Sequence, residues 1–108
     1  MTHPSKVKGD RFERLVADYL AEKVTVERIP AGATVDRGDL WTPGKQTIQC
    51  KDVNHMSLGS WVDEATQQMV NNNHRAAWVV HKRRGVTAAA DQFVTCDLSQ
   101  LRDLLETL

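Results

Sequence analysis

The chain has 108 residues, and its 14 lysines and arginines balance its 14 aspartates and glutamates, so its formal net charge is zero. This length suits one domain, residues 1–108, with a modest core, and the 41% hydrophobic and 26% charged content is ordinary for a globular protein. No apolar run approaches the roughly 20 residues of a membrane span, and no signal-peptide core opens the chain. Composition thus argues against a membrane protein and a uniformly basic nucleic-acid coat. We expect a cytoplasmic location, in a bacterium or a phage-infected cell, where Cys50 and Cys96 would stay reduced.

The strongest periodic signal lies near the N-terminus. Apolar residues recur there at the i, i+3, i+4, i+7, i+8 spacing of an amphipathic helix: Phe12, Leu15, Val16, Tyr19 and Leu20. The helix is predicted to begin between Ser5 and Asp10 and to end near Lys23. Glu13 lies at the edge of the apolar stripe, where it is either a solvated partner of a nearby base or an acid that reaches over the sheet.

Residues 24–29 are predicted to form a first strand that ends at Pro30, and residues 31–38 a loop. The segment 39–51 then reads as a β-hairpin. A two-residue turn at Pro43-Gly44 would pair Asp39 with Ile48, whereas a three-residue loop over 43–45 pairs Asp39 with Gln49. The longer loop is favoured, because proline suits a type I or II turn better than the primed turns of two-residue hairpins.

Gln49 and Lys51 are two residues apart and therefore share one face of their strand, while Ile48 and Cys50 point to the other face. An exposed sheet face is the commoner cause of such alternation. With the longer loop, however, the Asp39 carboxylate joins an amide oxygen and an ammonium group at one place. Asp36, in the preceding loop, is a rival for the role of Asp39 and ranks second because it lies further from this strand.

A second helix is predicted to begin with Ser60 as its N-cap and to end in the asparagine run 71–73. Its buried stripe is expected to contain Trp61, Val62, Ala65 and Met69. Gln68 lies at the edge of that stripe. Residues 76–81 form an apolar run that indicates a strand buried on both faces.

The C-terminal part is predicted to contain a short strand, 93–96, and a leucine-striped helix that is capped by Asp97 with Gln100 three residues later. Residues 86–91 are consistent with either a helical turn or a loop. Two groups of basic residues are candidates for binding phosphate: Lys6, Lys8 and Arg11 in the first helix, and Lys82, Arg83 and Arg84 after the fourth strand.

Asp39 followed by Gln49-Cys50-Lys51 resembles the signature of the PD-(D/E)XK nuclease superfamily. The predicted element order, αβββαβ followed by βα, matches the core of that superfamily, and Gly9-x-x-Phe12-Glu13 is similar to the first helix of archaeal-type Holliday junction resolvases. The resemblance covers roughly residues 6–82. It implies an α/β fold with a mixed sheet and a restriction-endonuclease-like core.

The resemblance also implies an endonuclease that depends on Mg²⁺ or Mn²⁺. Its ligands would be Asp39, Glu13, the side-chain oxygen of Gln49 and the backbone carbonyl of Cys50, and Lys51 would stabilise negative charge on the phosphate or orient the water. Gln68 would flank the site. Most members of the superfamily carry glutamate at the position of Gln49. The glutamine would weaken metal binding or mark an inactive relative, although some transposase-associated endonucleases carry Gln-x-Lys.

The implied substrate is branched DNA, as for a Holliday junction resolvase, and symmetric cleavage of two strands implies a homodimer. Two alternatives stay open. The chain could be a non-catalytic DNA-binding or assembly module on the nuclease fold. It could instead be a nuclease that acts on linear duplex or single-stranded DNA.

Overall fold

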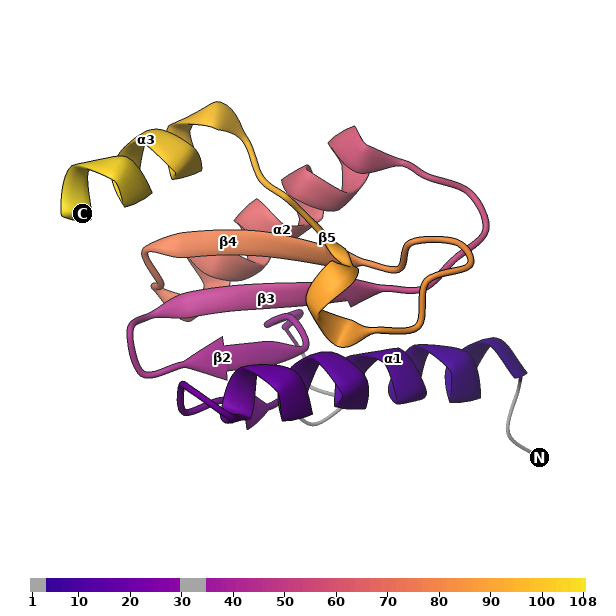
Figure 1. The fold of residues 1–108 in the computed structure, drawn as a ribbon. Helices are drawn as coiled ribbons and strands as arrows, with labels where there is room; N and C mark the ends of the chain where they lie inside the picture. Colours follow the sequence, from indigo (N-terminus) through magenta and orange to yellow (C-terminus); the bar gives the residue numbers. More distant parts are fainter. Residues whose placement is uncertain (1–3, 30–34) are drawn as a thin grey trace.

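The structure is a computed structural model that describes residues 4–29 and 35–108 (Figure 1). Its elements follow one another as α1 (Pro4–Ala21), β1 (Glu27–Arg28), β2 (Leu40–Thr42), β3 (Gln46–Lys51), α2 (Leu58–Asn72), β4 (Ala76–His81), the 3₁₀ turn η1 (Ala89–Asp91), β5 (Phe93–Thr95) and α3 (Leu98–Thr107). This order confirms the predicted αβββαβ series and the βα pair after it. None of the helices in these residues is long and apolar enough to cross a membrane.

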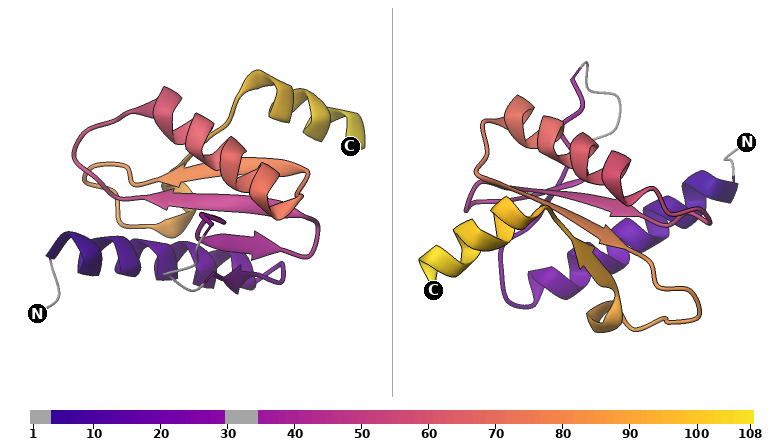
Figure 2. Two further views of the ribbon diagram at one scale, coloured as in Figure 1. Left: turned by 180° about the vertical axis from the view of Figure 1, so that it is seen from behind. Right: turned by 90° about the horizontal axis from the view of Figure 1, so that it is seen from above.

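The five strands form one mixed sheet in the order β1-β2-β3-β4-β5. The first three strands are antiparallel neighbours, β4 runs parallel to β3, and β5 is antiparallel to β4. Helix α2 makes the crossover that the parallel pair requires. Figure 2 shows α1 and α2 on opposite faces of the sheet, so the chain forms a three-layer α+β domain.

Each face of the sheet has its own hydrophobic cluster. The cluster beneath α1 contains Phe12, Val16, Ala17, Leu40, Ile48 and Val80. The cluster beneath α2 contains Trp61, Ala65, Ala77 and Val79. Adjacent residues of β4 thus enter opposite layers, as the period of two in a strand requires. The prediction that residues 76–81 are buried on both faces is confirmed.

The hairpin between β2 and β3 has the predicted three-residue loop. The last paired residues are Thr42 and Gln46, and the Lys45 N–H donates to the Thr42 carbonyl at 3.1 Å. Lys45 closes the loop with a φ of 62°, the left-handed conformation typical of three-residue hairpin loops. The ladder ends at the pair Leu40 and Ile48, and Asp39 directly before β2 lies beside residues 48–50 of β3, since its N–H donates to the Ile48 carbonyl and its carboxylate accepts the Cys50 N–H; the predicted pairing of Asp39 with Gln49 is not part of the ladder.

Three predicted boundaries were wrong. Helix α1 begins at Pro4, one residue before the predicted range Ser5–Asp10. The first strand contains only Glu27–Arg28 rather than residues 24–29, and Val24 is exposed, because pairing with the short strand β2 involves only those two residues. Pro30, its predicted end, lies outside the described residues.

Helix α2 begins at Leu58 after Ser57, not after Ser60, since the Ser57 carbonyl already accepts the Trp61 N–H at 2.9 Å. Its predicted end is confirmed: Asn73 takes the left-handed conformation with a φ of 56°.

Helix α3 is confirmed, but its leucines are not covered. The Asp97 side chain caps the helix by accepting the Gln100 N–H at 3.1 Å. The Gln100 side chain does not return this bond and instead accepts the Ala77 N–H at 3.3 Å. The exposed fraction of the five leucines runs from 40% to 90%, because α3 extends past the end of the sheet (Figure 1). Tyr19, predicted in the apolar stripe of α1, is likewise exposed.

The entry into β2 depends on a glycine. Gly38 has a φ of +87°, and a Cβ added to it would lie 2.8 Å from the Thr47 Cγ2. We expect Gly38→Ala to lower the free energy of unfolding by about 2 kcal/mol, of which the left-handed backbone alone accounts for about 1–2 kcal/mol. Gly59→Ala is the matched control: its Cβ meets no heavy atom within 4 Å, and helix α2 should gain about 0.5–1 kcal/mol. Urea unfolding measures both, and equal stability of the two variants would contradict this account.

Candidate active site

The site is centred on the Asp39 carboxylate at the end of the β2–β3 ladder. The Asp39 N–H donates to the Ile48 carbonyl at 3.0 Å, and the Asp39 Oδ2 accepts the Cys50 N–H at 2.7 Å. The peptide groups of Ile48 and Cys50 are two residues apart in β3, so both face β2. The Asp39 carboxylate therefore bonds the Cys50 N–H where the backbone of a longer β2 would do so. It lies on the side of β3 toward which the Cys50 carbonyl also points.

Burial is the main reason that the pKa of Asp39 is raised from 3.8 to about 6. The Cys50 N–H lowers the pKa in part. The neighbouring charges act in both directions: Glu13 and Asp36 raise the pKa, and Lys51 lowers it. Three charged groups from α1, the loop before β2 and strand β3 thus lie close to Asp39. Together the carboxylates leave an excess of negative charge around it.

Glu13 reaches this site from α1, as predicted. It is largely buried, and its Oε1 accepts a hydrogen bond from the Arg28 Nε at 3.0 Å. Besides burial, the negative charges of Asp39 and Glu13 raise the pKa of the Cys50 thiol, whereas Arg28 lowers it. Cys50 and Cys96 are free thiols, in agreement with the prediction. Arg28 was not predicted to belong to the site, because nothing in its sequence neighbourhood links it to Glu13.

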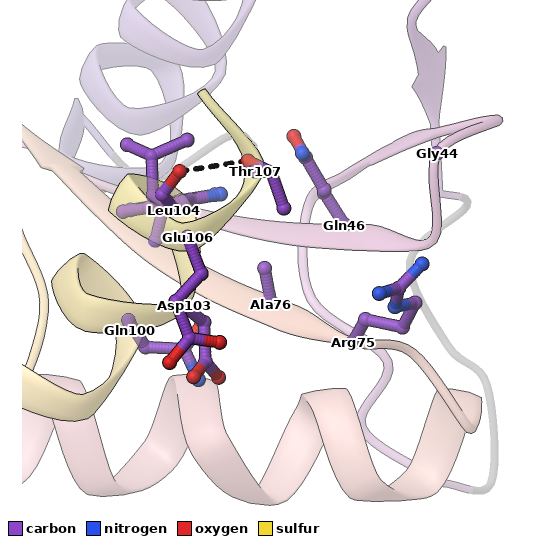
Figure 3. Close-up of a pocket in the computed structure, with 10 residues that line it drawn as sticks. Gly44, Gln46, Arg75, Ala76, Gln100, Asp103, Leu104, Glu106 and Thr107 are labelled. Carbon is purple, nitrogen blue, oxygen red and sulfur yellow. Dashed lines mark hydrogen bonds between the residues drawn. The ribbon is translucent and has the colours of Figure 1, made fainter.

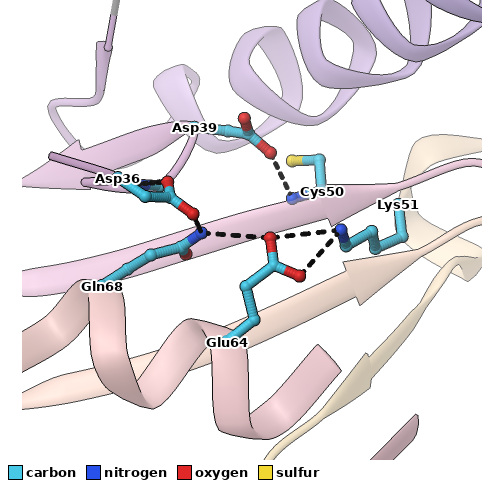
Figure 4. Close-up of polar contacts among 7 residues, drawn as sticks. Asp36, Asp39, Cys50, Lys51, Glu64 and Gln68 are labelled. Atoms are coloured by element: carbon cyan, nitrogen blue, oxygen red, sulfur yellow. Dashed lines mark hydrogen bonds and ion pairs between the residues drawn. The ribbon is translucent and has the colours of Figure 1, made fainter. Parts of the chain in front are cut away.

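Lys51 belongs to a row of polar side chains on the α2 side of the sheet (Figure 4). Its Nζ lies 3.2 Å from the Glu64 Oε2. The Gln68 Nε2 lies 3.4 Å from the Glu64 Oε1 and donates to the Asp36 Oδ2 at 2.7 Å. Gln68 is only 1% exposed, so the predicted flanking residue is a buried link in this row.

Glu64 is the residue of this row that the sequence analysis missed. The signal that could have revealed it is its position four residues before Gln68, which places both side chains on one side of a helix. Asp36 was ranked below Asp39 because of its distance along the chain. The loop nevertheless brings Asp36 into the same network through Gln68, while Asp39 alone contacts the backbone of β3.

Two amide oxygens in this region are buried without a hydrogen-bond partner among the described residues, the Oε1 atoms of Gln49 and Gln68. Most buried polar atoms in proteins have a partner, so these two call for an explanation. Gln49 is only 8% exposed, which rules out the exposed-face interpretation of its strand. Unpartnered amide oxygens are groups that a hard cation could bind.

The predicted donor set is therefore chemically consistent with a hard divalent ion. Asp39, Glu13, Gln49 and the Cys50 carbonyl would offer oxygen atoms only, which Mg²⁺ and Mn²⁺ prefer. Within residues 4–29 and 35–108, no three His, Cys, Asp or Glu side chains gather as a ready metal site. A site here would thus depend on two carboxylates and two neutral oxygens.

A basic pocket of about 760 Å³ lies beyond the carboxyl ends of β3 and β4, next to Lys51. Four of the six predicted phosphate-binding residues line it: Lys8, Lys82, Arg83 and Arg84. His55, His81 and Phe93 complete much of its wall. The two basic segments, far apart in sequence, therefore meet at the end of the sheet where Lys51 lies.

The predicted basic residues are not equivalent. Lys8 lies 3.4 Å from the Asp52 carboxylate, and the Lys82 Nζ donates to the carbonyls of Arg83 and Val86 in its own loop. Arg11 lines a different, smaller hollow on α1, and Lys6 is exposed nearby. Of the four basic residues that line the pocket, Lys8 and Arg84 are exposed, whereas Lys82 and Arg83 are half-buried.

Another pocket, of about 420 Å³, lies between α3 and the first residues of β3 and β4 (Figure 3). Arg75, Gln46 and Asp103 are among its lining residues. Gln46 starts the strand that Lys51 ends, so this pocket is at the opposite end of the sheet from Asp39. It contributes nothing to the candidate active site.

Comparisons of this chain with protein-family models, with curated proteins and with solved structures find no match.

The raised pKa of Asp39 predicts a pH-dependent loss of stability. The Asp39 carboxyl group has a pKa of about 6 in the folded state and of 3.8 in the unfolded state. The folded state therefore binds more protons between these two pH values, and the free energy of unfolding falls as the pH rises through this window. A difference of roughly two units corresponds to about 3 kcal/mol as an upper value. Asp39→Asn keeps an acceptor for the Cys50 N–H and should be more stable than the wild type at pH 7.5, but not below pH 4.

Urea unfolding between pH 4 and 7.5, without divalent ions, measures this difference. The exposed Asp63, changed to Asn, is the control and should leave the pH profile unchanged. A destabilised Asp39→Asn protein at pH 7.5 would contradict the electrostatic description of the site.

Proposed function

We propose that this protein is a divalent-metal-dependent DNA endonuclease with a restriction-endonuclease-like fold, and that it acts on branched DNA. The observation that carries the proposal is the contact of Asp39 with β3, in which its carboxylate accepts the N–H of Cys50, the residue between Gln49 and Lys51. The element order and the mixed sheet support the resemblance to PD-(D/E)XK nucleases. The basic pocket beside Lys51 supports DNA as the substrate.

Mg²⁺ or Mn²⁺ would be held by Asp39, Glu13, the Gln49 amide oxygen and the Cys50 carbonyl. Such an ion, when bound, supplies an activated water and neutralises charge on the phosphate. The chain prepares the site by leaving the Gln49 Oε1 unpartnered and by gathering carboxylates whose mutual repulsion a cation would relieve.

The reaction would be hydrolysis of a phosphodiester. The water oxygen bonds to phosphorus, the bond from phosphorus to one sugar oxygen breaks, and that oxygen takes a proton, so one DNA end keeps the phosphate. The Lys51 ammonium group would stabilise the negative charge that develops on the phosphate. Glu64, 3.2 Å from the Lys51 Nζ, is a positioning residue that holds the ammonium group toward the site.

DNA would be bound mainly through its phosphates. Arg84 and Lys8 border the pocket next to Lys51, and they concentrate positive charge on one side of a chain with no net charge. Contacts of this kind position a nucleic acid without reading its bases. Through such contacts the site would select a substrate by its shape rather than its sequence.

A non-catalytic DNA-binding module is the second candidate. The observation that favours it is Gln49, which gives the site one negative charge fewer than most PD-(D/E)XK nucleases have. The pairs Lys51–Glu64 and Glu13–Arg28 would in that case be ordinary structural ion pairs. Metal binding and cleavage separate the two candidates.

The cleavage test uses a four-way junction, a linear duplex and a single strand, each with and without Mg²⁺. We expect the wild type to cut the junction in the presence of Mg²⁺, and Asp39→Asn and Lys51→Ala to lose this activity while they remain folded. Gln49→Glu should remain active and bind Mn²⁺ more tightly, because it adds a carboxylate. Lys23→Ala changes an exposed lysine at the end of α1 and is the control.

Titration calorimetry with Mn²⁺ checks the same assignment without DNA. If the wild type binds Mn²⁺ and the Asp39→Asn variant does not, the result supports the nuclease. If the wild type does not bind Mn²⁺, the result indicates the non-catalytic module. Loss of activity in a folded Gln49→Glu protein would contradict the ligand role of Gln49.

Symmetric cleavage of a junction requires two active sites, and we propose that the protein is a homodimer that packs through α3. The support is the leucine face of α3, whose Leu101, Leu104 and Leu105 side chains are 41%, 40% and 57% exposed. A second copy of the same face would cover these side chains.

Light scattering tests this arrangement. We expect a mass of twice the 12.1 kDa chain for the wild type and a monomer for a Leu104→Glu, Leu105→Glu variant. Tyr19→Glu alters an exposed apolar residue of α1 and should leave the dimer intact. A monomeric wild type at micromolar concentration would contradict the proposal.

A further inference from the structure

Three residues of neighbouring strands lie side by side at the end of the sheet. Lys51 of β3 is paired with His81 of β4, and His81 is paired with Phe93 of β5. Strands are spaced by about 4.8 Å, so the Phe93 backbone lies roughly 10 Å from that of Lys51. The His81 ring contacts Trp61 of α2 at 5.6 Å and Phe93 at 5.8 Å between centroids, which places this row on the face that α2 covers.

Phe93 lies in β5, the strand at the edge of the sheet. It is 49% exposed and belongs to the wall of the basic pocket. The Arg83 guanidinium carbon lies 4.5 Å from the centre of the Phe93 ring. The guanidinium therefore lies over one face of the ring, and we call this stacked pair in the wall of the pocket the Phe93–Arg83 platform.

The platform is held in place before any ligand arrives. The Arg83 N–H donates to the Gln92 Oε1 at 2.7 Å, and the Arg83 guanidinium donates to the Asp91 carbonyl at 3.2 Å. A fixed planar surface loses little conformational entropy when another ring stacks on it. An exposed aromatic ring beside basic residues is the combination that proteins use to bind unpaired nucleotides.

On the basis of the proposed nuclease function, we propose that the basic pocket binds an unpaired nucleobase of the DNA, which stacks on the Phe93–Arg83 platform. The adjoining phosphates would lie along Arg84 and toward Lys51. Bases of an intact duplex are stacked on one another and cannot reach a pocket at the end of the sheet, whereas a base at a bulge, a flap or a strand exchange can. The volume of about 760 Å³ is within the range of pockets that hold small ligands.

The proposal narrows the substrate class to DNA with an unpaired nucleotide close to the phosphate at the active site. Stacking does not depend on base identity, because every base has a π-face. The pocket would consequently distinguish unpaired from paired DNA without reading sequence.

The test measures binding of two duplexes that differ only in one bulged 2-aminopurine, in EDTA, so that no cleavage occurs. We expect the bulged duplex to bind more tightly than the paired one by about 5- to 150-fold, the ratio that 1–3 kcal/mol of stacking gives. The fluorescence of the bulged base should be quenched on binding. Phe93→Leu, which keeps an apolar side chain but no ring, should lose both the preference and the quenching, and Phe93→Tyr should keep them.

Arg84→Ala is the matched control in the same pocket. It should weaken binding of both duplexes alike and reduce the slope of log K against log salt by about 0.9. Equal affinity for the two duplexes, or a preference that Phe93→Leu retains, would overturn the proposal. Affinity and fluorescence need neither metal nor cleavage. A preference for the bulged duplex would therefore support the base pocket even if the protein cut no DNA. If the protein cuts DNA but shows no such preference, the base pocket is refuted and the nuclease function is not.

Discussion

The hydrogen bond from the Cys50 N–H to the Asp39 carboxylate is the contact on which the candidate site depends. Strand β2 begins at Leu40, directly after Asp39, whereas its antiparallel neighbour β3 continues past Ile48 to Lys51, so the Cys50 N–H would otherwise lack a partner in β2. The side chain of Asp39 satisfies that group and is thereby fixed at the edge of the sheet. The three-residue loop at the other end of the hairpin sets the register that makes this possible.

Charge balance explains much of the arrangement around this contact. Burial alone would disfavour the Asp39 anion, and Glu13 and Asp36 add negative charge, while Lys51 offsets part of it. The nearby bases are largely engaged, Lys51 with Glu64 and Arg28 with Glu13. The carboxylates and the unpartnered amide oxygens are the features that support the proposed divalent ion.

The two ends of the sheet serve different purposes in this interpretation. The carboxyl ends of β3 and β4 bring Lys51 beside the basic pocket, where DNA would be bound and cut. The exposed leucine face of α3 extends past the sheet and would be covered by a second copy of the chain in the proposed dimer. The proposed dimer contact would therefore not compete with DNA for the Phe93–Arg83 platform.

Local patterns in the sequence by themselves determined the element order, the hairpin loop and the shared face of Gln49 and Lys51, because strand alternation, helical periodicity and turn chemistry act over a few residues. They did not determine which partners those elements meet. The Lys51–Glu64 pair joins residues 13 apart, and Phe93 reaches the pocket only because β5 pairs with β4. The exposure of the α3 leucines was also decided in the tertiary structure, since periodicity marks an apolar face but not whether another surface covers it.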